Sequence, residues 1–243
     1  MLPIILQLPP KRRATTTYTQ RVIALSPIAY WPLAESSGSV AVDASGNARN
    51  GAYTSVTLGA EGIGDGRTAA TFTNNTSYAD VYTASLAGAF NGDLGTLAAW
   101  AKVSAAGVWT DGAQHYILAF VADGSNYVLI RKNSTTNQIT YQRSAGGTQS
   151  TVQDTTGAGT LAWFHVAVTW NRGGNEFRAY LNGAQVGTTQ AASAAFVGSL
   201  AAATTLIGGV NKTPTLTWSG TLAHAAVWTS ALSAADVAAL ATL

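Results

Sequence analysis

The side chains that could hydrolyse a glycosidic bond are few and widely spaced in this 243-residue chain. Glycoside hydrolysis needs two carboxyl groups flanking the scissile bond, about 5–5.5 Å apart in retaining enzymes and about 6.5–9.5 Å apart in inverting ones. The glutamates are Glu35, Glu61 and Glu176, far apart in the sequence. Glu61 and Asp65 are four residues apart, but they lie in a turn rich in glycine. The sequence therefore predicts no catalytic residues and no enzyme.

Nucleophilic and transition-metal chemistry lack their usual residues as well. The chain has no cysteine and no Gly-x-Ser-x-Gly motif, and its histidines, His115, His165 and His224, are scattered. No two histidines have the short spacing that metal ligands often show. We interpret His165, in the middle of an alternating strand pattern, as a hydrogen-bonded residue on a sheet face rather than a catalytic one.

The segment from Asp43 to Asn47, Asp-Ala-Ser-Gly-Asn, has the residue types of a turn. An aspartate side chain can accept bonds from nearby backbone N–H groups, and Gly46 and Asn47 tolerate a left-handed backbone. The alternative is a calcium site, with Asp43 and Asn47 as two of the six to eight oxygen ligands that calcium needs. Because so few carboxylates lie nearby, we favour the architectural interpretation and expect no cofactor, with calcium as the alternative.

Tryptophan is the residue type most relevant to sugar binding, because its ring can stack on a pyranose face. Of the seven tryptophans, four lie in strand patterns and are expected in the core: Trp31, Trp100, Trp170 and Trp228. We expect Trp109 and Trp218 to be exposed, because they lie in segments rich in Gly, Thr and Pro. The sequence predicts that these two contact a glycan or a protein partner, without deciding between them.

The elements that must position these residues are mostly short strands. Strand-length runs bounded by Gly, Asn, Asp and Ser are expected at 69–73, 79–83, 95–104, 115–122, 126–133, 138–144, 163–171, 204–208 and 217–229. A hairpin is expected over 176–189, because Asn182-Gly183 suits a type I′ turn. No intervening helical pattern separates these runs. The pattern therefore predicts an all-β fold, an antiparallel two-sheet jelly-roll sandwich.

One helix is expected, at the C-terminus. Ser233 is a good N-cap, and Asp236 three residues later approximates a capping box. Leu232 and Val237 have the spacing of a hydrophobic staple. We expect this short helix to seal an end or edge of the sandwich.

Residues 1–25 are predicted to form an extended basic arm ahead of a jelly-roll domain over 26–243. The arm has three prolines, and the chain has no acid before Glu35. We expect the arm to anchor the protein to neighbouring subunits, with docking on its own domain as the alternative. The residues expected to make this contact are Leu2, Ile4, Ile5, Leu6, Leu8, Lys11, Arg12 and Arg13.

Composition adds two expectations. Charged residues are only 10% of the chain, so little charge repulsion opposes association, and we expect a homo-oligomer within a larger assembly. The net charge is +2, and the basic excess lies in the arm, so nothing on the body indicates a nucleic-acid groove. No apolar run is long enough to span a membrane.

The quoted segments "YWPLAESSGSVAVDASGNARNGAY", "FHVAVTW", "RAYLNGAQVG" and "WSGTLAHAAVWTSALSAADVAAL" resemble laminin-G-like, concanavalin A-like jelly-roll domains of the kind found in bacteriophage structural proteins. The resemblance covers about 22–243. It implies a concanavalin A-like fold, but this fold has many functions. Within it, the glucanase branch carries a Glu-x-Asp-x-x-Glu strand that this chain lacks.

From the resemblance, the low charge and the arm, we predict a non-enzymatic virion structural protein, in a capsid decoration or a tail, with other virion proteins as partners. The alternative is a lectin-like adhesion module that recognises host-surface glycans. The predicted location is the virion, with the bacterial cell surface or secretion as the alternative.

Overall fold

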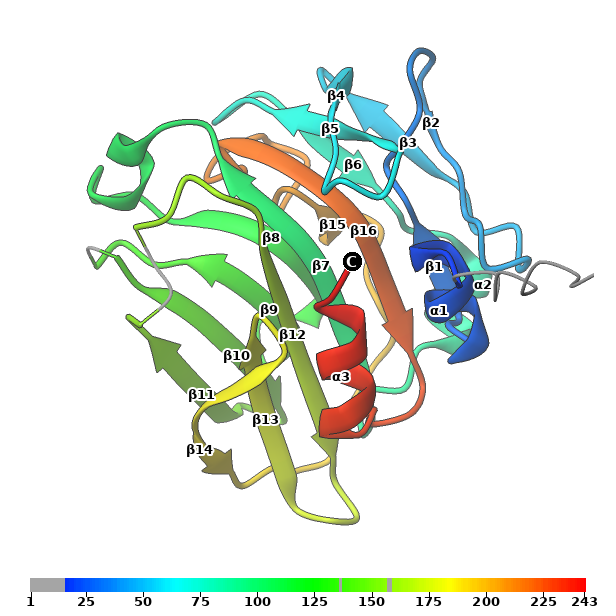
Figure 1. The fold of residues 1–243 in the computed structure, drawn as a ribbon. Coiled ribbons are helices and arrows are strands. Elements are labelled where there is room, and N and C mark those ends of the chain that lie inside the picture. Colours follow the sequence, from blue (N-terminus) through cyan, green and yellow to red (C-terminus); the bar gives the residue numbers. More distant parts are fainter. Residues whose placement is uncertain (1–15, 136, 157–158) are drawn as a thin grey trace, which may run out of the picture.

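The computed structural model describes residues 16–135, 137–156 and 159–243, and it shows two antiparallel sheets packed face to face (Figure 1). The residues named above for the assembly arm, Leu2 to Arg13, lie outside the described residues. In spatial order, sheet A contains β14 (Ala184–Gln190), β13 (Glu176–Leu181), β12 (Phe164–Asn171), β7 (Leu94–Val103), β16 (Gly220–Trp228), β5 (Thr68–Phe72) and β4 (Thr57–Glu61), and β1 (Ala29–Trp31) also pairs with β16.

Sheet B faces sheet A across the core. In spatial order it contains β11 (Thr148–Asp154), β10 (Ile139–Ala145), β9 (Asn126–Lys132), β8 (His115–Asp123), β15 (Thr205–Ile207), β6 (Tyr78–Asp80), β3 (Gly51–Thr54) and β2 (Val40–Ala41). The predicted fold class, an all-β jelly-roll sandwich with a short C-terminal helix, is confirmed.

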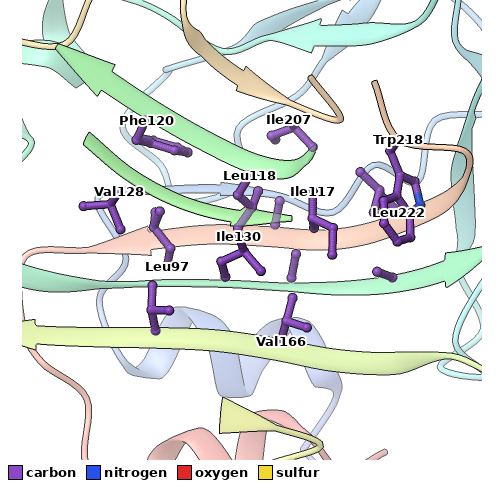
Figure 2. Packing of buried hydrophobic residues seen from close by; sticks show 14 of the residues in the cluster. Leu97, Ile117, Leu118, Phe120, Val128, Ile130, Val166, Ile207, Trp218 and Leu222 are labelled. Atoms are coloured by element: carbon purple, nitrogen blue, oxygen red, sulfur yellow. The ribbon is translucent and has the colours of Figure 1, made fainter. Parts of the chain in front are cut away.

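The main core lies between the sheets. Figure 2 shows part of it, where Leu97 of β7 and Val166 of β12 face Ile117 and Ile130 of sheet B. The alternation predicted for β12 is confirmed. The side chains that point into this core are those of Phe164, Val166, Val168 and Trp170. The side chains that lie on the outer face of sheet A are those of His165, Ala167 and Thr169.

Two helices cover the outer face of sheet A and bury it. Helix α3 (Ala234–Leu240) begins at Ser233, and both halves of the capping box with Asp236 are present, as predicted. It lies over the sheet rather than at an end of the sandwich (Figure 1), because Val237 and Leu240 pack among side chains such as Trp228 of β16.

Helix α1 (Tyr18–Ala24) is a correction to the prediction of an extended arm over residues 1–25. Thr17 caps this helix, and the side chain of Gln20 completes a second capping box. Tyr18 and Val22 are buried in the same cluster as α3. The guanidinium of Arg21 donates to the main-chain oxygen of Ala239, in the last turn of α3, and to that of Thr242, just after the helix ends. This part of the predicted arm therefore docks on its own domain.

The remaining helical elements are short and were not predicted. They are α2 (Ala84–Ala89) and a 3-10 turn, η1 (Ala106–Trp109). Across the three described ranges, no helix combines the length and the hydropathy that a membrane span would require.

The predicted hairpin is present between β13 and β14. Asn182 and Gly183 both have positive φ, 48° and 81°, as a type I′ turn requires. A Cβ on Gly183 would lie 2.9 Å from the Cα of Ala238 in α3. The glycine therefore serves the turn and also allows the C-terminal helix to approach closely.

Candidate functional site

The outer face of sheet B carries the arrangement that best fits ligand binding. Because paired residues of antiparallel strands share a face, the registers define three rows across β8, β9, β10 and β11. The rows are Tyr116–Arg131–Thr140–Gln153, Ala119–Leu129–Gln142–Thr151 and Val121–Tyr127–Ser144–Gln149. We call these twelve residues the outer platform.

The outer platform is polar, aromatic and free of carboxylates. Its side chains are those of two tyrosines, three glutamines, two threonines, one serine, one arginine and three aliphatic residues. Gln149 and Gln153 are exposed, while Tyr127, Arg131 and Thr151 are partly exposed. Aromatic rings beside amide groups are the combination that recognises sugars, since the rings stack on pyranose faces and the amides bond to hydroxyl groups.

A chain of hydrogen bonds orients the amides. Nε2 of Gln142 donates to Oε1 of Gln149 at 2.9 Å, and Nε2 of Gln149 donates to the Tyr127 hydroxyl at 3.0 Å. Each glutamine thus has a fixed direction, leaving other lone pairs and N–H bonds for a ligand. Burial raises the pKa of the Tyr127 hydroxyl, so this group stays protonated.

The other end of the outer platform is built around Tyr116. Nη1 of Arg131 donates to the Tyr116 hydroxyl at 3.1 Å, and that hydroxyl donates to Oε1 of Gln114 at 3.2 Å. Val210 and Leu216, from the segment between β15 and β16, pack against this end. Tyr116 is therefore largely buried, and Tyr127 is the more accessible ring.

The predicted contacts at Trp109 and Trp218 are wrong, because both side chains are buried in the main core. The η1 turn folds Trp109 inward, where its ring lies 5.7 Å from that of Phe164 and its Nε1 donates to Thr160 O. The Trp218 ring also packs against Phe164, edge-on at 6.3 Å, and Figure 2 shows it beside Leu222. These rings close one end of the sandwich and cannot stack on a sugar.

The turn at Asp43 is architectural, as favoured from the sequence. Its carboxylate accepts bonds from the backbone N–H groups of Tyr30, Ser45 and Arg49 and from the Ser45 hydroxyl, all at 2.9 Å. Nδ2 of Asn47 donates to Ile28 O and to Ser45 Oγ. Both side chains thus tie β1 to the turn, and the Asp43 oxygens predicted as calcium ligands are already occupied.

The carboxylates elsewhere are also engaged in structural bonds. Apart from Glu61, every Asp and Glu side chain accepts a hydrogen bond or pairs with a base. Asp111, for example, lies 2.7 Å from Nζ of the fully buried Lys132 and 2.6 Å from His115. Among the residues with described positions, no three His, Asp or Glu side chains gather as metal ligands would.

His165 is buried on the outer face of sheet A, as expected, but it is not hydrogen-bonded. Neither ring nitrogen has a partner among the described side chains, and the ring packs 5.3 Å from that of Trp100. Burial lowers the pKa of His165 to about 3, and the nearby His224 adds to this effect. The ring is therefore a neutral packing group.

His224 lies in a second buried polar cluster, beneath α1. Its Nδ1 lies 2.6 Å from the Tyr30 hydroxyl, and its Nε2 lies 3.2 Å from the Asp65 carboxylate, although without hydrogen-bond alignment. Contact with His224 lowers the pKa of Asp65. The backbone of His224 has φ 53°, at a bulge that shifts the register between β16 and β7, while β16 itself runs unbroken from Gly220 to Trp228.

Several hollows of the surface lie outside the outer platform, and two of them adjoin titratable side chains discussed above. One of about 400 Å³ is lined by Phe90, Asp93 and Phe196, and one of about 570 Å³ by Tyr18, Arg21 and Asp65. In the first, Asp93 already accepts from Arg143, Arg172 and the Phe196 N–H group. In the second, Asp65 faces His224. Both hollows are therefore surrounded by side chains that hold the fold together.

Comparison with known proteins places the chain in a family. The profile Laminin_G_3, described as the concanavalin A-like lectin/glucanases superfamily, matches residues 73–238. The chain belongs to this family. No curated protein sequence matches it.

Solved structures share the fold at low sequence identity. The binding domain of botulinum neurotoxin serotype D has a TM-score of 0.63 and 14% identity, over 93% of this chain and 52% of that one. This chain thus spans about half the length of the toxin domain. Domain 4 of AbnA, an extracellular arabinanase from Geobacillus stearothermophilus, was solved with arabinotriose and has a TM-score of 0.59 and 13% identity, over 89% of this chain and 98% of that one.

A third structure is the ligand-binding domain of botulinum neurotoxin serotype D with N-acetylneuraminic acid, at a TM-score of 0.63 and 13% identity, over 92% of this chain and 52% of that one. The two toxin domains are described as binding domains and the arabinanase domain was solved with a bound sugar, and none of the three is described as a virion protein. The concanavalin A-like, laminin-G-like resemblance is confirmed, whereas the bacteriophage context and the virion role stay predictions.

Sequence reasoning missed the outer platform although it predicted three of its four strands. The signal was the alternation along each strand, which places Tyr127 and Arg131 on one face of β9. That signal was ambiguous, because Lys132 and Arg143 point inward and Leu129 points outward. Strand β11, which supplies Gln149, Thr151 and Gln153, was not predicted.

Proposed function

We propose that this protein is a non-catalytic carbohydrate-binding module that binds a glycan on the outer platform. The observation that carries the proposal is the hydrogen-bonded chain from Gln142 through Gln149 to Tyr127, in which a partly exposed ring adjoins two oriented amides. The binding domains that share the fold support the proposal, and so does the engagement of the carboxylates in structural bonds. The module acts where glycans are displayed, at a cell surface or in the extracellular medium.

The side chains of the outer platform can bind a sugar but cannot cleave its glycosidic bond. A pyranose face stacks on the ring of Tyr127, while Gln149, Gln153 and Thr151 reach its hydroxyl groups. No carboxylate of the platform can protonate a leaving group or attack the anomeric carbon. Binding therefore leaves the glycosidic bond intact.

The test is affinity electrophoresis and a glycan array with the unmodified protein and single variants. We expect Tyr127→Ala and Gln149→Ala to weaken binding about tenfold or more, as the loss of a stacking or hydrogen-bonding group does. The matched control is Gln185→Ala, an exposed glutamine on β14 of the other sheet, which should bind like the unmodified protein. Equal binding by all four proteins, or binding to no glycan, would contradict the proposal.

A further inference from the structure

The outer platform carries one cation and no anion. Arg131 is its only charged residue, and no Asp or Glu among the described residues lies within ion-pair distance of its guanidinium. Three basic residues of the strands, Lys132, Arg143 and Arg178, each pair with a carboxylate. Arg131 differs from these three because its charge is uncompensated among the described residues, as is that of Lys102 in β7 of the other sheet.

The Arg131 guanidinium is held by the protein through its Nη1 side, where it contacts Tyr116. Nη1 donates to the Tyr116 hydroxyl, and the carbon Cζ lies 5.4 Å from the centre of the Tyr116 ring. Nε has no acceptor in the described part of the chain, and no hydrogen bond is formed there by Nη2. The Nε–Nη2 edge is the one with which arginine grips a carboxylate through two parallel bonds.

A second donor beside Arg131 also lacks a partner. Thr140 lies directly opposite Arg131 in the β9–β10 register, and its side chain is buried. Its Oγ1 has no hydrogen-bond partner in the described ranges. Leaving buried donors unbonded costs about 1–3 kcal/mol each, so two adjacent ones form a place where an acceptor is favoured. A carboxylate oxygen can accept from both groups at once.

We infer that the Tyr116–Arg131–Thr140 corner of the outer platform binds the carboxylate of an acidic sugar, so that the glycan class is carboxylated rather than neutral. This inference rests on the proposed function. The sugar ring bearing the carboxylate stacks toward the tyrosines, and its carboxylate meets the free edge of Arg131. A small opening of the side chains around Nε and Thr140 Oγ1 accompanies binding, because both atoms are covered in the free protein.

The experiment compares oligogalacturonate with the same oligosaccharide fully methyl-esterified, so that the two probes share the sugar backbone and differ at the carboxyl groups, which the ester leaves uncharged. We expect the unmodified protein to bind the acid at least about tenfold more tightly, and to lose this preference as salt is raised. Arg131→Gln should abolish the preference, while Arg131→Lys should retain part of it, because the charge remains without the fork. Thermal unfolding of each variant checks that it is folded.

The charge-matched control is Arg178→Gln, which removes a cation from β13 on the other sheet and should keep the preference. A direct readout is the 15N resonance of the Arg131 Nε–H group, which should shift with glucuronate and not with its methyl ester. If neutral and acidic glycans bind equally and Arg131→Gln has no effect, the inference is wrong while the proposed function stands. If no glycan of either kind binds, both are wrong.

Discussion

Several titratable residues of this protein pack in the core instead of doing chemistry, and His165 is the clearest example. It sits between hydrophobic neighbours in β12 with no hydrogen-bond partner among the described residues, and burial depresses its pKa to about 3. An ordinary histidine has a pKa near 6.5. Below that pH, the unfolded chain takes up a proton that the folded chain excludes. The free energy of unfolding must therefore fall as the pH is lowered from about 6.5 toward 3.

We expect urea unfolding to show a loss of about 2 kcal/mol between pH 7 and pH 4.5 from this one group. His165→Phe keeps a ring beside Trp100 and removes the titrating group, so its stability should depend less on pH in this window. His224, whose pKa burial also lowers, remains in the variant and accounts for a residual slope. The assignment to His165 fails if both proteins show the same pH dependence.

The sequence predicted the core tryptophans and the turn at Asp43, because strand alternation and turn chemistry are local. It did not predict that Trp109 and Trp218 are buried. Their burial depends on Phe164, to which both rings pack from segments distant in the chain. Exposure of a loop residue is a property of the tertiary fold, so local composition misled here.

Helix α1 is the element whose role changed most between sequence and structure. Its sequence, "YTQRVIA", is too short to show helical periodicity, and the prolines and bases before it suggested an extended arm. The helix is stabilised by contacts with elements at the other end of the chain. Nε1 of Trp100 donates to the Tyr18 hydroxyl at 2.9 Å, and Arg21 bonds to the end of α3.

Two N-terminal deletions separate the arm from the helix. Deleting residues 1–15 keeps the whole of α1 and its contacts, so this protein is the reference for the longer deletion. Deleting residues 1–25 uncovers the surface under Tyr18 and Val22, and we expect the free energy of unfolding to fall by at least about 2 kcal/mol. Circular dichroism melting measures both. Equal stability of the two truncated proteins would show that α1 does not hold the domain together.

At the scale of the whole molecule, the two sheets have opposite surroundings. Helices α1 and α3 pack on the outer face of sheet A (Figure 1). The outer face of sheet B carries the outer platform, of which Gln149 and Gln153 are exposed and Tyr127, Arg131 and Thr151 are partly exposed. The described chain begins at residue 16, just before α1, which lies beside α3 on the outer face of sheet A. The arrangement leaves the outer platform free to meet a ligand, while helix α1 lies on the opposite face of the sandwich.

The sheet order could not be predicted from the sequence, because sequence neighbours such as β7 and β8 lie in different sheets. The outer platform depends on that order. It combines four consecutive strands, and its polar character appears only when their outward residues are put in register. Local patterns therefore predicted the fold class, while the site required the structure.

The central claim is that a glycan binds to the outer face of β8–β11 and nowhere else. The most direct measurement is a series of 1H–15N correlation spectra recorded while an oligogalacturonate is added to the full chain. We predict that the largest shifts occur at Tyr127, Arg131, Gln142 and Gln149, with the outer face of sheet A unchanged. Shifts centred on the Asp93 hollow or on α1, or no shifts at all, would contradict the account.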